Sequence, residues 1–268
     1  MEKGELIGKG RTAEIYAWGN DRVLKLYYNW CLADWAQYEA TVQQAVHAAG
    51  IPSPRVDEII HIEGRHGVVM ERITGPTMLE VLEKQPWRLS EFAGIQAELH
   101  AAVHNCHVTG LEKAGAKLWG MIARAPSIPG SSKQWLMARL VSLPDGDAVC
   151  HYDFHPMNVI MSLRGPVIID WMAASAGNPL LDISRTWLVL TRAAWPFGFP
   201  YNIVITPMRR MFYAAYFQRY RRLRPVDLKQ LEEWRQITIA ARLGENIPSE
   251  NDRLLALLRI PGGVKNGA

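Results

Sequence analysis

The sequence predicts an α+β protein of two lobes, in which a small antiparallel sheet precedes a larger, mainly helical part. Two patterns carry this prediction. Up to about residue 75, short β-like runs alternate with turn signals, and from Leu89 onward apolar residues recur at helical spacing. The length of the chain is consistent with two lobes, because 268 residues with 49% hydrophobic side chains can bury a sizeable core. We expect an N-terminal lobe over residues 1–74 and a C-terminal lobe over residues 75–268.

The N-terminal lobe is expected to combine five strands with one helix. The helix should span Ala33–Ala49 and end at Gly50, because prolines follow at once. Turn signals around Gly19 and Gly64 predict hairpins. The strands are predicted over Glu5–Ile7, Glu14–Trp18, Arg22–Tyr27, Val56–Ile62 and His66–Arg72.

The C-terminal lobe is expected to be helical around a short β region. Ser90 is predicted to cap a helix that runs to about Cys106, and Thr206 to cap another that starts at Pro207. Two short strands are predicted over Asn158–Met161 and Val167–Ile169. Further helices are predicted over Ser132–Ser142, Leu180–Thr191, Pro207–Tyr220, Pro225–Ala241 and Asn251–Leu258.

Composition excludes several classes of protein. Three scattered cysteines cannot form a disulfide framework or a Cys-x-x-Cys metal clip. No apolar stretch is long enough to cross a bilayer and the first residues do not resemble a secretion signal, so we expect a cytoplasmic protein without a membrane partner. The net charge is only +4 and is not gathered into a tail, which makes nucleic acid an unlikely partner. The oligomeric state is not predicted.

The segment His151–Asn158 carries the clearest chemistry. Asp153 and Asn158 lie five residues apart on what must be a loop, because Pro156 disfavours both helix and strand. Asp170 directly follows a strongly apolar strand. Carboxylate and amide oxygens suit Mg²⁺, which proteins hold through one or two such groups together with substrate phosphates. A further Asp can orient a substrate hydroxyl and accept its proton.

This pattern resembles the catalytic and metal-binding loops of the protein-kinase-like phosphotransferases. His-x-Asp-x-His-Pro-x-Asn followed by Ile-Asp-Trp is similar to the form in the aminoglycoside phosphotransferase and choline kinase branch, as is Gly177–Asp182. The resemblance implies a bilobal protein-kinase-like fold with ATP (or GTP) and Mg²⁺ as cofactors. It also implies roles for five residues: Asp153 as catalytic base, His155 beside it at a phosphate-contacting position, Asn158 and Asp170 as metal ligands, and Asp182 as a brace for the loop.

The N-terminal lobe would supply the nucleotide site. Gly8 and Gly10 lie in a turn between two strands, as a phosphate-covering turn should. By the resemblance, Lys25 on the third strand holds the α- and β-phosphates and Glu39 on the following helix pairs with it. Asp34 is the other acid on that helix, but it lies at the helix start, where a carboxylate suits the dipole.

The edge strand and hinge of the family resemble residues 68–75. Main-chain groups hold adenine there, so we expect the carbonyl of Glu71 and the amide of Ile73 to bind the base. Met70 would pack beside the ring.

Two positions depart from the family pattern: Tyr152 stands where bacterial members usually have Gly, and Asn178 where they have Asp. If the first position needs positive φ, a bulky side chain there would strain the loop. The leading hypothesis is an ATP-dependent phosphotransferase acting on a hydroxyl of a small molecule, similar to the aminoglycoside phosphotransferases. The alternatives are a kinase for another metabolite (choline-like, sugar or macrolide) and a nucleotide-binding pseudokinase, which Tyr152 motivates.

The charge of the acceptor can be predicted from the last third of the chain. Residues 186–268 contain thirteen basic and six acidic side chains, a net charge of +7. A site for a polycationic aminoglycoside should be acidic, so we expect a neutral, monocationic or anionic acceptor. His100, His104 and His107 share one helix face, but no fourth ligand is evident, and we interpret them as helix packing and not as a zinc site.

Overall fold

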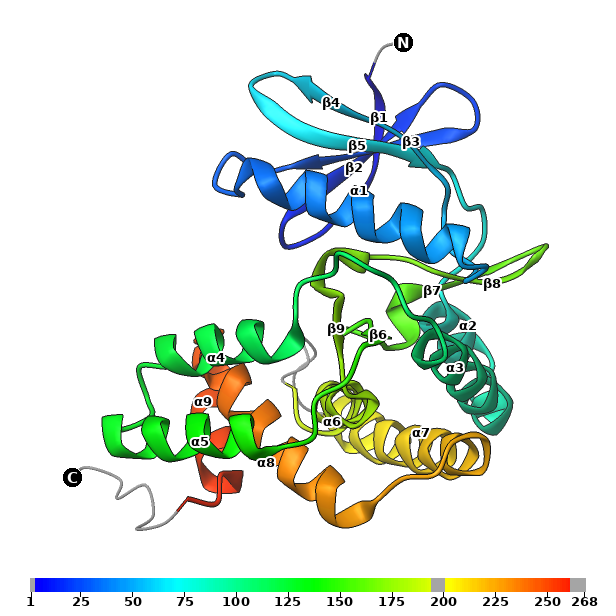
Figure 1. Ribbon diagram of the computed structural model, residues 1–268. Helices are drawn as coiled ribbons and strands as arrows, with labels where there is room; N and C mark the ends of the chain where they lie inside the picture. Colours follow the sequence, from blue (N-terminus) through cyan, green and yellow to red (C-terminus); the bar gives the residue numbers. More distant parts are fainter. Residues whose placement is uncertain (1–2, 194–200, 261–268) are drawn as a thin grey trace. The chain divides into compact units, whose positions relative to one another are not determined.

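The computed structural model describes residues 3–193 and 201–260, and confirms the predicted α+β class (Figure 1). Contacts divide the chain into two compact units. The first unit contains Met1–Pro86 and Pro156–Ala174, and the second contains Trp87–His155 and Ser175–Ala268.

The first unit is built on a five-stranded antiparallel sheet in the order β1-β2-β3-β5-β4. Helix α1 (Ala33–Ala48) packs on one face of this sheet (Figure 1). Residues alternate between the two faces, as a pleated strand requires. Leu24 and Leu26 pack with Trp18 on the face away from α1. The strands span Lys3–Lys9 (β1), Ala13–Trp18 (β2), Arg22–Tyr27 (β3), Val56–Ile62 (β4) and Arg65–Glu71 (β5).

A second hairpin and a short helix also belong to the first unit. Strands β7 (Val159–Ser162) and β8 (Gly165–Ile168) pair with each other, and the amide of Met161 donates to the carbonyl of Pro76 at 2.8 Å. A Cβ at Gly75 would clash with the Met161 carbonyl, so only glycine allows this approach. Helix α2 (Met78–Lys84) follows. These contacts keep residues 75–86 with the first unit, whereas the expected lobe boundary lies at residue 74; the division by function stays a prediction.

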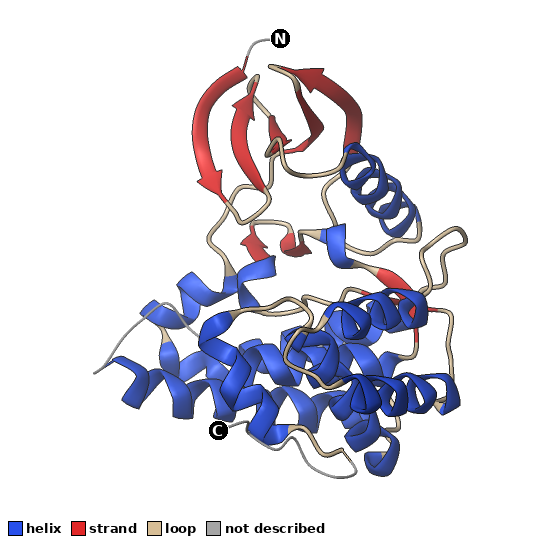
Figure 2. Ribbon diagram, turned by 90° about the vertical axis from the view of Figure 1, so that its left-hand side faces the viewer, coloured by secondary structure: helices blue, strands red, loops and turns tan. Residues whose placement is uncertain are grey.

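The second unit consists mainly of helices, blue in Figure 2. Helix α3 packs along α7, and α6 packs along α8. Strand β6 (Ala148–Cys150) pairs with β9 (Ser175–Gly177) and brings the segments that flank the hairpin together. The helices span Leu89–His104 (α3), Ala114–Arg124 (α4), Gly130–Ser142 (α5), Pro179–Thr191 (α6), Tyr201–Leu223 (α7), Leu228–Leu243 (α8) and Pro248–Leu257 (α9).

Several predicted helix boundaries are wrong. Helix α7 begins at Tyr201, so Thr206 lies inside it and does not cap it. Pro207 also lies inside this helix, where its missing amide removes one helical hydrogen bond. Ser90 lies inside α3, which Arg88 precedes. Asp227 caps α8 by accepting from two backbone amides. Helices α2 and α4 were not predicted, and α4 has no side-chain cap.

Candidate active site

Strand alternation places Lys25 on the face of the sheet that α1 covers. Because Leu24 and Leu26 point away from α1, their neighbours Lys25 and Tyr27 point toward it. Lys25 Nζ lies 2.7 Å from Glu39 Oε1, and the Tyr27 hydroxyl donates to the other carboxylate oxygen of Glu39. The structure therefore places Glu39 against Lys25, and both side chains are almost entirely buried.

Lys25 also contacts Asp170 Oδ1 at 2.7 Å. Burial alone would lower the pKa of Lys25, but the carboxylates of Asp170 and Glu39 hold it above its usual value. Burial, reinforced by Asp170, raises the pKa of Glu39 although Lys25 opposes the shift. One ammonium thus faces two carboxylates, and when all three are ionised the net charge of −1 favours a further cation.

The hairpin of β7 and β8 places Asn158 beside Asp170. Val159 pairs with Ile168, and the amide of Ile169 donates to the backbone carbonyl of Asn158 at 3.0 Å. Asp170 is the next residue; its backbone is left-handed (φ 66), and 42% of its side chain is exposed. Side-chain amide and carboxylate oxygens at one end of a hairpin are a donor set that fits Mg²⁺.

The glycine turn and the hinge residues also lie in the first unit. Ile15 of β2 pairs with Gly8 on one side and with Lys25 on the other, so the three residues lie in one row across the sheet. Gly10 lies in the turn after β1, where its amide donates to the Ala13 carbonyl. At the end of β5, Met70 is buried against α1, Glu71 forms an ion pair with Arg164 at 2.6 Å, and Ile73 is half-buried.

The loop after β6 presents Asp153 and His155 together in the second unit. His155 Nε2 lies 3.4 Å from Asp153 Oδ2, and the amide of Asp153 donates to the imidazole of His151 at 3.3 Å. Partial burial opposes ionisation of Asp153, but His155, Arg185 and His151 outweigh it and hold the pKa of this carboxyl well below its usual range. Asp153 is therefore ionised at neutral pH, with 34% of its side chain exposed.

Asp182 of α6 holds the backbone of this loop. Its carboxylate accepts the amide of His151 at 2.5 Å and the amide of Tyr152 at 2.9 Å. The imidazole Nε2 atoms of His100 and His104 lie 3.1 and 3.3 Å from Asp182 Oδ2. Burial opposes ionisation, yet these partners hold the pKa of Asp182 well below its usual range. The carboxylate is fully buried and therefore acts as a brace.

The two histidines are positioned from their other side by α7. Nδ1 of His100 lies 2.6 Å from the Tyr216 hydroxyl, and Nδ1 of His104 lies 2.7 Å from the Tyr220 hydroxyl. His107 lies apart, exposed beside Asp147. His100, His104 and Asp182 could geometrically hold a metal, but Asp182 already accepts two loop amides. The packing interpretation of the two buried histidines therefore accounts for their contacts.

Tyr152 adopts the strained backbone that its position requires. Its φ is 63, in the left-handed region, and the side chain is 3% exposed. The ring lies 4.9 Å from the guanidinium carbon of Arg185 and 5.1 Å from Lys117 Nζ, while Arg185 Nε donates to the Tyr152 carbonyl at 3.2 Å. Arg185 in turn pairs with Glu245 at 2.8 Å. The bulky residue is accommodated because its ring is buried against the side chains of Arg185 and Lys117.

A family model described as "Phosphotransferase enzyme family" matches residues 4–234 and so includes both groups of site residues. The chain belongs to this family. A search of curated proteins by sequence finds no match. Within the part of the chain that the structure describes, no helix is both long and apolar enough to span a membrane.

Solved structures of the family's kinases share the fold. An aminoglycoside-3'-phosphotransferase of type VIII superposes with a TM-score of 0.63 at 19% identity, covering 91% of this chain and 93% of its own. An aminoglycoside phosphotransferase in a ternary complex with AMP-PNP and hygromycin B has a TM-score of 0.63 at 15% identity (94% and 89% covered). An amicoumacin kinase in complex with AMP-PNP and Ca²⁺ has a TM-score of 0.63 at 14% identity (94% and 85% covered). These likenesses confirm the protein-kinase-like fold.

Arg185, Lys117 and Glu245 are residues of the site that the sequence did not predict. Arg185 follows Asp182 by three positions, which places both on one side of α6, and this spacing was the available signal. Burial lowers the pKa of Lys117 to about 8. Glu245 is distant in sequence, so no local pattern identifies it as the partner of Arg185.

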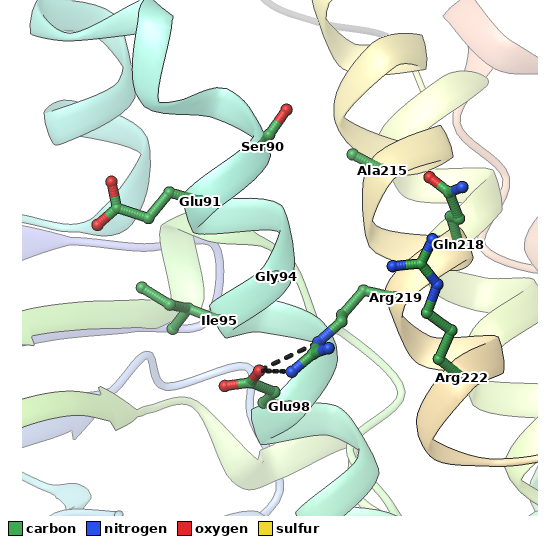
Figure 3. Close-up of a pocket in the computed structure, with 9 residues that line it drawn as sticks. All are labelled: Ser90, Glu91, Gly94, Ile95, Glu98, Ala215, Gln218, Arg219 and Arg222. Atoms are coloured by element: carbon green, nitrogen blue, oxygen red, sulfur yellow. Dashed lines mark hydrogen bonds and ion pairs between the residues drawn. The ribbon is translucent and has the colours of Figure 1, made fainter.

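A separate pocket of about 450 Å³ lies between α3 and α7 and contains none of the predicted site residues (Figure 3). An ion pair of Arg219 with Glu98 at 2.5 Å crosses it, joining α7 to α3. The pocket is lined by Ser90, Glu91, Gly94, Ile95, Glu98, Ala215, Gln218, Arg219 and Arg222.

The left-handed backbone of Tyr152 predicts that Tyr152→Gly is more stable than Tyr152→Ala, the reverse of the usual order for glycine and alanine. Tyr152→Ala and Tyr152→Gly both lose a buried ring and should each lose about 3 kcal/mol of unfolding free energy. Alanine in a left-handed backbone costs a further ~1 kcal/mol, so the glycine variant should be the more stable of the two in urea unfolding. Glu63→Ala and Glu63→Gly are the control pair, because Glu63 also has a positive φ (54) but is exposed and loses no buried ring. Equal stability of the two Tyr152 variants would show that the loop is unstrained.

The buried imidazole of His104 predicts a loss of stability in acid. Burial, with His100 nearby, lowers the pKa of His104 from 6.5 to about 3. The unfolded chain therefore binds more protons between these values, and the free energy of unfolding should fall as the pH drops below about 6.5. His104→Gln should flatten this slope in thermal melts between about pH 6.5 and 4, and His107→Gln should not. An unchanged slope in His104→Gln would refute the assignment.

Proposed function

We propose that the protein transfers the γ-phosphate of a nucleoside triphosphate, ATP in the first instance, to a hydroxyl group of a small molecule. The observation that carries the proposal is the ionised, partly exposed carboxylate of Asp153 on a loop whose backbone is fixed by Asp182. Family membership and the neighbours solved with AMP-PNP support it.

Asp153 would act on the acceptor hydroxyl mainly by orienting it. A carboxylate with a depressed pKa is a weak base, so it holds the hydroxyl by accepting its hydrogen bond and takes the proton only as the new O–P bond forms. His155 can donate to the other side of the carboxylate or to a phosphate oxygen, because its Nε2 lies 3.4 Å from Asp153 Oδ2. The proposed base and its neighbour thus come from one short loop.

Lys25 would bind the phosphates of the nucleotide, held in place by Glu39. Asn158 and Asp170 would hold Mg²⁺, which when bound neutralises charge on the transferred phosphoryl group. Gly8 and Gly10 would cover the phosphates, and Glu71, Ile73 and Met70 would hold the base. The buried ring and preserved left-handed backbone of Tyr152 support an active enzyme over a pseudokinase.

Asp153→Asn tests the proposed role of the carboxylate. Loss of the orienting group should reduce kcat by about two orders of magnitude or more, while nucleotide affinity stays close to wild type. The measurement is ADP release in a coupled assay with a panel of hydroxyl compounds, alongside nucleotide binding by calorimetry. Asp145→Asn, at an exposed carboxylate just before β6, is the matched control. Wild-type turnover in Asp153→Asn would remove Asp153 from the mechanism.

Asp170→Asn tests the metal site separately. Mg²⁺ should tighten nucleotide binding in the wild type by bridging protein and phosphates, and this Mg²⁺ dependence should be strongly reduced in the variant, which replaces a charged ligand by a neutral amide. Affinity measured in EDTA should change much less, because Lys25 keeps Glu39 as its partner. Asp21→Asn, at an exposed carboxylate in the same unit, should keep the Mg²⁺ effect. A full Mg²⁺ effect in Asp170→Asn would contradict the assignment.

A further inference from the structure

Five arginines from four helices gather at the C-terminal end of α6. Arg192 ends this helix, and its pKa is lowered by burial and by repulsion from Arg210, Arg253 and Arg235. Burial and Arg253 likewise lower the pKa of Arg209. Arg209 and Arg210 belong to α7, Arg235 to α8 and Arg253 to α9. We call these five residues the arginine cluster.

Two members of the arginine cluster lie over the indole ring of Trp187. The guanidinium carbon of Arg235 lies 4.8 Å from the centre of the indole ring, and that of Arg192 lies 5.6 Å from it. Arg235 Nη2 also donates to the Tyr213 hydroxyl at 3.2 Å. Two cations on one indole repel each other, and an anion beside them would relieve that repulsion.

Helix capping explains why two members of the cluster lie at the end of α6, but it does not explain the positions of the other three. Arg209 donates to the carbonyl of Val189 at 2.5 Å, and Arg253 donates to the carbonyl of Arg192. Cations at a helix C-terminus are stabilised by the last carbonyls. Capping of this kind does not account for Arg235, which belongs to α8 and lies against Trp187.

The acidic residues near the cluster do not balance its charge. Glu250 favours the charged form of Arg209, but it is already bound through both oxygens by Arg242, at 2.7 and 3.0 Å. Glu232 is shared at long range between Arg235 (3.4 Å) and Arg259 (3.6 Å). The buried Nε atoms of Arg192 and Arg235 have no hydrogen-bond partner among the residues that the structure describes. A buried donor without a partner is costly, and an anionic oxygen that entered the cluster would accept hydrogen bonds from these two atoms.

We infer that the arginine cluster binds an acidic group, a carboxylate or a phosphate, of the molecule that accepts the phosphoryl group. That the bound molecule is the phosphoryl acceptor rests on the proposed function. Helix α6 connects the two places: the Thr186 hydroxyl donates to the carbonyl of Phe154, the residue after Asp153, at 3.1 Å, and Trp187 comes next. At a rise of about 1.5 Å per residue, Arg192 lies about 9 Å further along α6, within the length of a small metabolite.

Two members of the arginine cluster, Arg235 and Arg253, lie beyond residue 234, where the match to the family model ends. Arginine suits this task because its planar fork binds carboxylate and phosphate through two parallel hydrogen bonds. The acceptor specificity that we infer therefore depends on the convergence of α6, α7, α8 and α9 in this chain.

The first experiment detects the anion without turnover. In protein labelled with ¹⁵N-arginine, the Nε–H signals of Arg192 and Arg235, assigned from Arg192→Lys and Arg235→Lys, should shift on titration with inorganic phosphate. The signal of Arg221, an exposed arginine on α7 outside the cluster, should not move. Binding that leaves the Arg192 and Arg235 signals unchanged, or that moves all three equally, overturns the inference.

The second experiment uses pairs of hydroxyl compounds that differ only in a carboxylate or its amide. The wild type should show a kcat/KM at least tenfold higher for the acid of the best pair. Arg192→Gln/Arg235→Gln should lose this preference through KM, Arg235→Lys should keep part of it, and Arg221→Gln should keep all of it, with melting temperatures confirming folding. Turnover without any preference for the acids overturns the inference and leaves the phosphotransferase intact. Shifts of the two signals without turnover of any compound support the anion site and contradict the proposed reaction.

Discussion

The buried carboxylate of Asp182 is the interaction on which the catalytic loop depends. It accepts the amides of His151 and Tyr152, and these bonds replace the water that a buried charge has lost. Tyr152, which donates the second of these amides, has a left-handed backbone, and Asp153 follows directly. The same helix supplies Thr186 and Arg185, which donate to the carbonyls of Phe154 and Tyr152. Three residues within two turns of α6 therefore set the path of four loop residues.

Buried charges with fixed partners also position other residues of the candidate site. Lys25 is held between Glu39 and Asp170, and Arg185 between Tyr152 and Glu245. Such pairs add little net stability, because desolvation offsets most of their attraction. Removing one partner leaves an uncompensated charge, however, so the arrangement is specific even where it is not strongly stabilising. This specificity is what a phosphotransferase needs, since its catalysis is mostly positioning and charge neutralisation.

The sequence predicted those parts of the structure that depend on local spacing. Alternation along β3 places Lys25 on the face of the sheet that α1 covers, beside Glu39. Contacts between distant segments were not predictable: Glu245 meets Arg185 only because the end of α8 packs near α6. The close approach of Gly75 to Met161, which keeps residues 75–86 with the first unit, could not be predicted from the sequence either. Helix α4 was missed because it has no side-chain cap and contains two glycines.

The positive charge of the C-terminal helices becomes informative only when its distribution is considered. At the end of α7, Arg219 pairs with Glu98 and Arg224 donates to the His104 carbonyl, so part of that charge is already used within the fold. The arginine cluster differs because helices far apart in sequence bring its members together with few acids between them. A field strong enough to select a ligand requires such convergence, since the interaction of exposed charges more than about 8 Å apart is largely screened in physiological salt. The net charge of +7 on residues 186–268 is therefore a weak guide by itself, and the packing of α6 to α9 converts part of it into a local preference for an acidic acceptor.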